Sequence, residues 1–385
     1  MKFMGYKRPD GTVGVRNYLL VLSSVVCANH VSRKISEAVP GTALFVHGNG
    51  CGQLGADGEQ TQRTLDGIAK NPNIAAVLVV SLGCEGSSAE RIVENVKATG
   101  RPAAHVRIQD CGGTTATIRA GINVLKEMAE KCLSQKREEV DIRDLVVSLE
   151  CGGSDATSGI SANPLVGWVS DRIISLGATA ILSETPEMIG AEHILSGRGV
   201  DPGVGKKITE IVKDVEKSAN AMHVDLRGTN PTPGNIEGGL SSIEEKSMGC
   251  LAKAGSSKVM EVVRYGEIPK SRGLVIMDTP GFDVESVTGM LAGGSQVILF
   301  TTGRGTPVGA PIAPVIKITG NPKVAEWMRE NIDFDASPIT LGKESLESAG
   351  ERLFQKLLYV ISGEQTSSEV LGHTETGITR IGPSV

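Results

Sequence analysis

The sequence has few aromatic residues, no long apolar segment and no excess of positive charge. Phe, Trp and Tyr together make up 3% of the chain. No stretch is long and apolar enough to span a bilayer, and the first residues, MKFMGYKRPDG, lack the apolar region of a signal peptide. The formal net charge is -5, which argues against nucleic acid or an anionic membrane as the main partner. We therefore expect a cytoplasmic protein with neither a nucleic-acid partner nor a membrane partner.

The cysteines do not form the pattern of a disulfide framework, because their number is odd and their spacing is wide. The seven are Cys27, Cys51, Cys84, Cys111, Cys132, Cys151 and Cys250. In a cytoplasmic chain of 385 residues, metal-binding or catalytic roles are more plausible than disulfides. Glycine, by contrast, is abundant at 48 residues, which indicates many places where the backbone closely approaches a helix or a ligand.

The first third of the chain alternates between short apolar runs and helical patterns. The runs cover 17–26, 42–47, 74–82 and 103–108, and the helical patterns cover 28–39, 58–70, 87–99 and 114–134. Near-continuous apolar strands separated by helices are typical of a parallel sheet with helices on both faces. Residues 1–135 are therefore predicted to form a doubly wound α/β domain.

The same alternation resumes after a charged segment at 134–144, which we interpret as a solvated helix end and linker. Buried strands are predicted at 145–149, 178–183, 273–278 and 295–302. Helices are predicted near 164–176, 187–197, 204–221, 241–254, 284–292, 323–330 and 345–361. Residues 145–385 then form a larger α/β domain with a polar, extended tail. The predicted fold is α/β, with two parallel-sheet domains of Rossmann-like or flavodoxin-like type.

The loops that follow the predicted strands are the expected place of a binding site, because ligands of open parallel sheets bind beyond the carboxyl ends of the strands. Four cysteines lie in such loops: Cys51, Cys84, Cys111 and Cys151. The other three fall in or beside helical patterns and are interpreted as packing residues. No loop fits a phosphate-loop or dinucleotide-binding pattern, so the glycines more plausibly bring backbone N–H groups to a small anion such as a carboxylate.

Charged residues in these loops are candidates for chemistry. Glu184 comes directly after a predicted strand, whereas Glu187 follows Pro186 and has a role in the helix dipole as its simpler explanation. Arg304 lies between two glycines after another strand and could either be solvated or bind a carboxylate with two hydrogen bonds. Asn235 and Lys246 flank a long Gly/Pro/Asn loop and are interpreted as structural.

Several long motifs resemble, in order, the large domain of altronate and galactarate dehydratases. They include GCGQLG, LGCE, CGGSDATSGISANP, SETPEMIGAE, NPTPGNIEGGLSSIEEKSMG, DTPGFDVESVTGMLAGG and LFTTGRGTPVG. The resemblance runs from about residue 5 to about residue 370. After the last motif, APIAPVIKITGNPKVAEWM replaces the Lys-Pro-rich continuation usual in the family, and the tail lacks the usual aromatic ending, which leaves the substrate open.

The resemblance implies a lyase that removes water from a sugar acid to give a 2-keto-3-deoxy acid. Such a reaction needs a base for the proton next to the carboxylate and a charge-stabilising group, for which the family implies Fe²⁺, or Mn²⁺ in its place. Because thiolates suit iron, we expect the metal at Cys51, Cys84 and Cys151. An iron–sulfur cluster is less favoured, because no compact cluster motif is present. The acid/base candidates are Glu85, Asp155 and Glu184, and the substrate-binding candidates are Ser154, Ser158, Asn163 and Arg304.

The resemblance also implies a partner. Family members usually carry a small N-terminal antifreeze-like domain, so we expect a separate small subunit together with a homo-oligomer of this large subunit. A related two-subunit enzyme, sulfolactate sulfo-lyase, eliminates sulfite instead of water, and its large subunit is the first alternative. The second alternative is a non-catalytic scaffold whose small partner supplies the chemistry.

Overall fold

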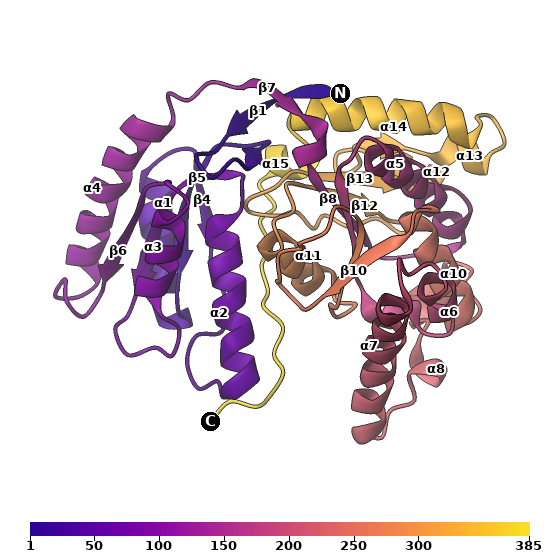
Figure 1. Cartoon of the computed structure of the whole chain (residues 1–385), viewed down its shortest axis with the longest axis horizontal. Helices are drawn as coiled ribbons and strands as arrows, with labels where there is room; N and C mark the ends of the chain where they lie inside the picture. Colours follow the sequence, from indigo (N-terminus) through magenta and orange to yellow (C-terminus); the bar gives the residue numbers. More distant parts are fainter.

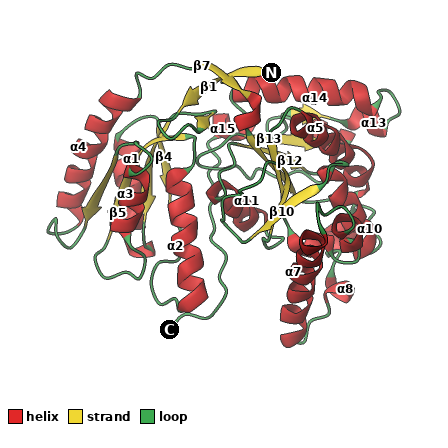
Figure 2. Cartoon of the chain, in the orientation of Figure 1, coloured by secondary structure: helices red, strands yellow, loops and turns green.

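Two parallel sheets stand side by side in the computed structural model, which describes residues 1–385 (Figure 1). A four-stranded sheet lies in the N-terminal part of the chain, and a seven-stranded sheet lies in the rest. Helices cover both sheets, which confirms the predicted α/β fold (Figure 2). None of the helices combines the length and the apolar character needed to cross a membrane.

The small sheet has the strand order β4-β3-β5-β6, and all its neighbouring strands are parallel. Its strands are β3 (Tyr18–Ser23), β4 (Thr42–Phe45), β5 (Ile74–Ser81) and β6 (Ala103–Arg107), and its helices are α1 (Asn29–Ala38), α2 (Gly55–Lys70), α3 (Ala89–Lys97) and α4 (Thr114–Cys132). Helix α1 packs beside α4, and α2 packs beside α3. Every residue of β5 is buried, as its uninterrupted apolar sequence predicts.

The large sheet has the order β10-β11-β9-β8-β12-β13-β14 and is parallel throughout. Its strands are β8 (Val146–Cys151), β9 (Thr179–Leu182), β10 (Val259–Val263), β11 (Gly273–Met277), β12 (Val297–Thr301), β13 (Val315–Thr319) and β14 (Phe334–Asp335). The chain starts the sheet at β8, adds β9 on one side and later adds β12 on the other. The strand order therefore reverses between β8 and β12, and this switch point is where open α/β sheets bind ligands.

Helices of the second part surround the large sheet. They are α5 (Asn163–Ser175), α6 (Glu192–Ser196), α7 (Pro202–Ala221), α8 (Leu226–Thr229), α9 (Pro233–Glu237), α10 (Ile243–Leu251), α11 (Asp283–Ala292), α12 (Pro322–Trp327), α13 (Ser337–Thr340), α14 (Leu346–Ile361) and α15 (Ser367–Leu371). Helices α5 and α14 pack together in the core on one face. On the other face α11 packs against α2 of the small sheet, and the apolar side chains of both sheets join there in one core cluster.

A third, antiparallel sheet connects the two parts, because it pairs segments that precede the first strand of each parallel sheet. Its order is β2-β1-β7, formed by β1 (Lys2–Lys7), β2 (Val13–Gly14) and β7 (Glu138–Asp141). The prediction of 134–144 as a solvated helix end and linker was therefore wrong for β7. That strand is short and mostly polar, with Val140 as its buried residue, so its sequence gives almost no strand signal.

The C-terminal tail is extended, as predicted, but it is anchored along the small sheet. In Figure 1 the tail is the yellow coil that runs beside α2. Arg380 forms an ion pair with Asp57 of α2 at 2.8 Å, and the Val385 amide donates to the Gly52 carbonyl at 3.1 Å. These contacts hold the tail beside the loop that follows β4.

Candidate active site

The loops that follow β8 and β12 cross at the switch point of the large sheet. The amide of Gly152 donates to the carbonyl of Thr301 at 3.0 Å, and the amide of Arg304 donates to the carbonyl of Gly153 at 2.8 Å. Glycine is needed here because the chains approach so closely. A Cβ atom on Gly303 would lie 2.1 Å from the Asp155 carboxylate. The two glycine-rich loops therefore fix the position of Asp155.

A cavity of about 340 Å³ opens at this edge of the sheet. Four of the residues predicted from the sequence line it: Ser154, Asp155, Ser158 and Asn163. Lys246 of α10 also lines it, although the sequence indicated a structural role for this lysine. The cavity thus presents the carboxylate of Asp155, one ammonium group, two hydroxyl groups and one amide, and the carboxylate of Glu245 also lies in its wall. Such a set suits a small polar molecule.

Asp155 is buried and held in one orientation. Its Oδ1 accepts hydrogen bonds from the Thr157 hydroxyl at 2.6 Å and from the Ser158 amide at 3.0 Å. Its Oδ2 accepts one hydrogen bond, from the Asn321 amide group at 2.9 Å. A carboxylate oxygen can accept more than one hydrogen bond, so Oδ2 keeps capacity for a ligand hydroxyl or for a proton.

Lys246 supplies a positive charge to the cavity wall. Its Nζ donates to Glu187 Oε1 at 2.8 Å and to Asn230 Oδ1 at 3.2 Å. Burial lowers the pKa of Lys246, but the charge of Glu187 and its hydrogen bond outweigh this effect and raise that pKa overall. Burial also raises the pKa of Glu187. Lys246 is therefore an ammonium ion at neutral pH, held in place by Glu187.

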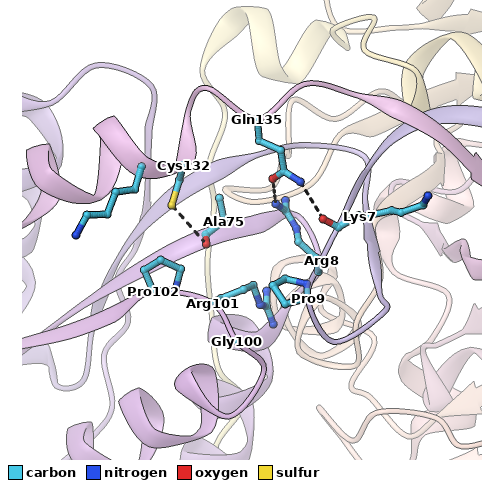
Figure 3. A pocket seen from close by; sticks show the side chains of 10 residues that line it. Lys7, Arg8, Pro9, Ala75, Gly100, Arg101, Pro102, Cys132 and Gln135 are labelled. Atoms are coloured by element: carbon cyan, nitrogen blue, oxygen red, sulfur yellow. Dashed lines mark hydrogen bonds between the residues drawn. The ribbon is translucent and has the colours of Figure 1, made fainter.

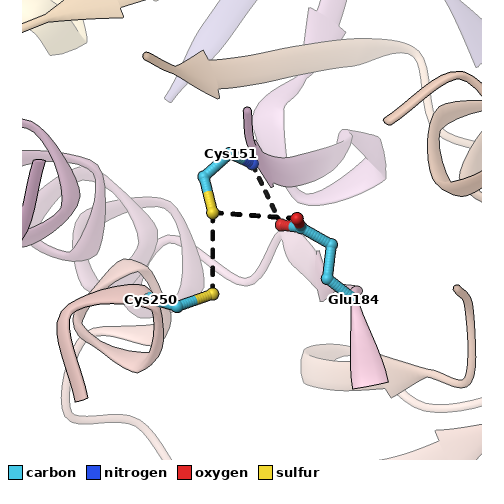
Figure 4. Close-up of side chains that lie close together, drawn as sticks. All are labelled: Cys151, Glu184 and Cys250. Atoms are coloured by element: carbon cyan, nitrogen blue, oxygen red, sulfur yellow. Dashed lines mark hydrogen bonds between the residues drawn. The ribbon is translucent and has the colours of Figure 1, made fainter. Parts of the chain in front are cut away.

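Four buried side chains lie next to the segments that line the cavity, since Cys151 comes shortly before Ser154 and Cys250 follows Gly249. We name Cys151, Glu184, Cys250 and Lys253 the Cys151 cluster. The two sulfur atoms are 3.7 Å apart, and Cys151 Sγ lies 3.7 Å from Glu184 Oε1 (Figure 4). Lys253 Nζ donates to Glu184 Oε2 at 2.7 Å. Glu184 is 1% exposed, so the predicted catalytic carboxylate is sealed from solvent, and Cys250, predicted to be a packing residue, belongs to the cluster.

Two further carboxyl groups near this cluster were missed from the sequence. Glu150 accepts hydrogen bonds from the hydroxyls of Ser183 and Ser286, and its pKa is raised by burial and by Glu184. Asp283 is half-buried, and burial together with Glu184 raises its pKa to about 7. A usable signal for Asp283 is its place at the end of the DTPGFD loop, at the first residue of α11.

Three predicted site residues lie at the carboxyl edge of the small sheet instead. The Glu85 carboxylate accepts from the Ser24 hydroxyl at 2.7 Å and from the Gly83 amide at 2.6 Å. Cys51 and Cys84 are exposed on neighbouring loops, and neither belongs to a group of three potential metal-ligand atoms. The structure does not join these cysteines with Cys151, because each parallel sheet has a carboxyl edge of its own.

Arg304 does not line the cavity. Its guanidinium donates to the Gly234 carbonyl at 2.8 Å and to Glu237 at 3.1 Å, both in α9. The loop after β12 is thereby tied to the helix that follows the long Gly/Pro/Asn loop. In the structure Arg304 holds α9 in place instead of presenting its donors to a ligand.

A second cavity of about 510 Å³ lies near the amino ends of β5 and β6 and is lined by basic residues (Figure 3). Its two arginines are already engaged. Arg8 donates to the carbonyls of Pro72 and Arg16, and Arg101 donates to those of Asn71 and Ile74. These guanidinium groups satisfy backbone carbonyls, so this cavity is a poorer candidate than the one at the switch point.

The fold is that of an α/β protein with a polar cavity at the switch point of its large parallel sheet. Residues 142–384 match the family model described as D-galactarate/Altronate dehydratase, C-terminal. Residues 5–133 match the one described as D-galactarate dehydratase/Altronate hydrolase, second domain. The chain belongs to this dehydratase family, which confirms the resemblance seen in the motifs, and its enzyme class is that of a hydro-lyase.

Three relatives show how far the similarity extends. Altronate dehydratase of Bacillus subtilis (strain 168) is 36% identical over 99% of this chain and 78% of its own length. The (2R)-sulfolactate sulfo-lyase subunit beta of Chromohalobacter salexigens is 36% identical over 98% of this chain and 97% of its own length. Galactarate dehydratase (L-threo-forming) of Escherichia coli (strain K12) is 36% identical over 94% of this chain and 73% of its own length.

Proposed function

We propose that this protein removes water from a sugar acid of the altronate or galactarate type and yields a 2-keto-3-deoxy acid. The names of the relatives support the substrate class. The observation that carries the proposal is the convergence of Asp155, Ser154, Ser158, Asn163 and Lys246 on one cavity. These groups match a substrate that carries a carboxylate and several hydroxyl groups.

Binding of the substrate carboxylate near Lys246 would prepare the reaction. The proton on the neighbouring carbon is only weakly acidic, and negative charge moves onto the carboxylate as the proton leaves. A fixed ammonium group beside that carboxylate stabilises this charge more than it stabilises the bound substrate. The hydroxyls of Ser154 and Ser158 and the amide of Asn163 would hold the hydroxyl groups of the sugar acid.

Asp155 is our candidate for the base. Its carboxylate takes the proton from the carbon next to the substrate carboxylate, with Oδ2 as the accepting atom. The bond to the hydroxyl group on the following carbon then breaks, and Asp155 returns its proton to that oxygen, so that water departs. The enol left behind becomes the 2-keto-3-deoxy acid. One carboxyl group can serve both steps because the two carbons are adjacent.

The family resemblance implies Fe²⁺, or Mn²⁺ in its place, which would add Lewis-acid stabilisation of the same charge. The donors of this chain do not fit an ion that must also hold the substrate. Among the described residues, Cys151, Glu184 and Cys250 are the group whose donor atoms lie within 4.8 Å of one another, and all three are buried. No step above therefore runs through a metal, and the ion and an iron–sulfur cluster stay predictions.

A second candidate function is that of a sulfolactate sulfo-lyase large subunit. The chain covers 97% of a relative that is named as the beta subunit of such an enzyme. Sulfite would then leave in place of water, with the same base and the same ammonium group. The name of this relative also supports our proposal of a separate small subunit, while a homo-oligomer of the large subunit stays a prediction.

The test is an anaerobic assay with altronate, galactarate and (2R)-sulfolactate, with and without ferrous iron. The chain is assayed alone and co-expressed with a candidate small subunit, and both the 2-keto acid and sulfite are measured. Asp155→Asn is expected to lower kcat by at least about 100-fold. Glu245→Gln is the matched control, because Glu245 also lines the cavity but its carboxylate binds Ser241 at the surface.

Lys246→Met is expected to raise KM and lower kcat together, because it removes a positive charge that stabilises both the bound substrate and the transition state of proton removal. Full turnover of the Asp155 and Lys246 variants would reject the assigned cavity. If substitutions in every strand-end loop leave turnover of the two-subunit complex intact, the chain is a scaffold and its partner is the catalyst.

A further inference from the structure

We propose that Cys151, Cys250 and Glu184 bind a divalent metal ion with affinity for thiolates, in a sealed site that supports the cavity from behind. This site differs from the three-cysteine site expected from the sequence, because Cys250 and Glu184 replace Cys51 and Cys84. The ion it would bind is Zn²⁺ or Fe²⁺, because these ions accept thiolate and carboxylate ligands together.

The spacing of the donor atoms is the first argument. The two sulfurs are 3.7 Å apart, and Cys151 Sγ is 3.7 Å from Glu184 Oε1. In a tetrahedral site with metal–sulfur bonds of about 2.3 Å, two sulfur ligands lie about 3.8 Å apart, and a sulfur and an oxygen lie about 3.6 Å apart. Figure 4 shows the three side chains pointing toward one another from separate segments of the chain. Two of the three donor pairs therefore already have the spacing of a metal site, and all three donor atoms lie within 4.8 Å of one another.

The hydrogen bonds of Glu184 are the second argument. Its Oε2 accepts from Lys253 Nζ at 2.7 Å and from the Cys151 amide at 3.0 Å, which holds the carboxylate in one orientation. Its Oε1 faces only the Cys151 thiol, a weak donor at 3.7 Å. Buried carboxylate oxygens normally have stronger partners. Oε1 is thus the atom left for a metal, while Lys253 and the amide orient the ligand from outside.

The charge balance of the cluster is the third argument. Without a metal, the cluster holds the Lys253–Glu184 ion pair and two thiol groups. One M²⁺ ion replaces two thiol protons, which are released to solvent, so the net charge of the cluster stays zero. Metal binding therefore adds no uncompensated charge to the interior.

The location of the cluster indicates a supporting role. Cys151 ends β8, Glu184 follows β9, and Cys250 lies in α10. Cys151 and Cys250 are 4% and 3% exposed, so the substrate cannot reach an ion between them. An ion bound there ties together the loop that carries Asp155 and the helix that carries Lys246, and a water molecule would complete its coordination.

Anaerobic titration of the full-length, metal-free protein with Co²⁺, Zn²⁺ and Fe²⁺ tests this site. We expect one tight ion per chain and, for Co²⁺, the intense near-ultraviolet absorption of thiolate ligation. Cys250→Ala is expected to lower the affinity at least about tenfold, whereas Cys132→Ala, which removes a half-buried thiol elsewhere, leaves it unchanged. Asp155→Asn should lose turnover and keep the ion, so this proposal and the proposed function fail separately.

Three results would overturn the proposal. One is a Co²⁺ titration of the unaltered protein that shows no thiolate absorption, a measurement that needs no variant to fold. Another is a Cys250→Ala protein that binds as tightly as the parent chain. The third is a Cys151–Cys250 disulfide, found by mass spectrometry, in protein purified anaerobically.

Discussion

Substituting Glu184 tests whether this carboxylate belongs to a buried ion pair with Lys253, as the structure shows, or is an exposed catalytic group, as the sequence suggested. Glu184→Gln removes the negative charge but keeps the size of the side chain. Lys253, which is 0% exposed, then keeps its charge without a charged partner. Breaking a buried pair in this way costs about 3–5 kcal/mol. That is a large part of the roughly 5–15 kcal/mol by which proteins are stable.

The assay is equilibrium urea unfolding of metal-free protein at pH 7, which separates this effect from any bound ion. Lys253→Met is combined with Glu184→Gln in a double-mutant cycle, and the double variant is expected to be more stable than the sum of the two single effects predicts. Asp214→Asn is the control, because Asp214 and Lys217 also lie 2.7 Å apart but are 68% and 73% exposed. That exposed pair should contribute less than about 1 kcal/mol.

Additive effects in the cycle, or a loss below about 1 kcal/mol for Glu184→Gln, would refute the reasoning that burial gives this pair its weight. The same two results would reopen the possibility that Glu184 is a solvated acid/base residue.

Two more substitutions probe the switch point. Gly303→Ala places a Cβ atom 2.1 Å from the Asp155 carboxylate and should cut kcat/KM at least about tenfold, whereas Gly48→Ala meets no atom within 4 Å and should leave it unchanged. Equal steady-state kinetics for the two variants would contradict this placement of Asp155. Asp283→Asn tests the pKa that burial and Glu184 raise from 3.8 to about 7. The folded protein binds the Asp283 proton more tightly than the unfolded chain does. The stabilisation that this proton gives is complete below the unfolded-state pKa of Asp283 and is lost as the pH rises through its folded-state pKa. The Tm advantage of Asp283→Asn should therefore grow from pH 4 to pH 7 and then level off, and a constant difference would contradict it.

The apolar pattern predicted the strands that are buried on both faces, but it missed strands whose polar residues are explained only by their neighbours. β13 contains Lys317, which is fully buried because its Nζ donates to the Pro307 carbonyl at 2.9 Å. A lysine inside the short run VIKIT breaks the apolar pattern, although the folded chain supplies its partner. The edge strand β10 is half-buried, so its sequence also mixes polar and apolar residues.

The candidate site divides in the same way. Ser154, Asp155, Ser158 and Asn163 belong to one short stretch after a predicted strand, so the rule for strand ends was enough to group them. Lys246 was interpreted as structural, because its own segment shows only a helix after a flexible loop. Its place in the cavity wall depends on how α10 packs, and a single sequence contains no record of that contact.

The sequence by itself determined the strands that are apolar throughout, the helices between them and the loops that follow those strands, because these follow from local apolar periodicity and from glycine. Only the tertiary structure decided which loops share an edge. Cys51 and Cys84 follow strands of one sheet, and Cys151 ends a strand of the other. Cysteines at similar positions in the sequence pattern therefore lie at two separate sheet edges. Cys250, about a hundred residues from Cys151 along the chain, lies 3.7 Å from it because α10 packs against residues 158–162, which follow β8.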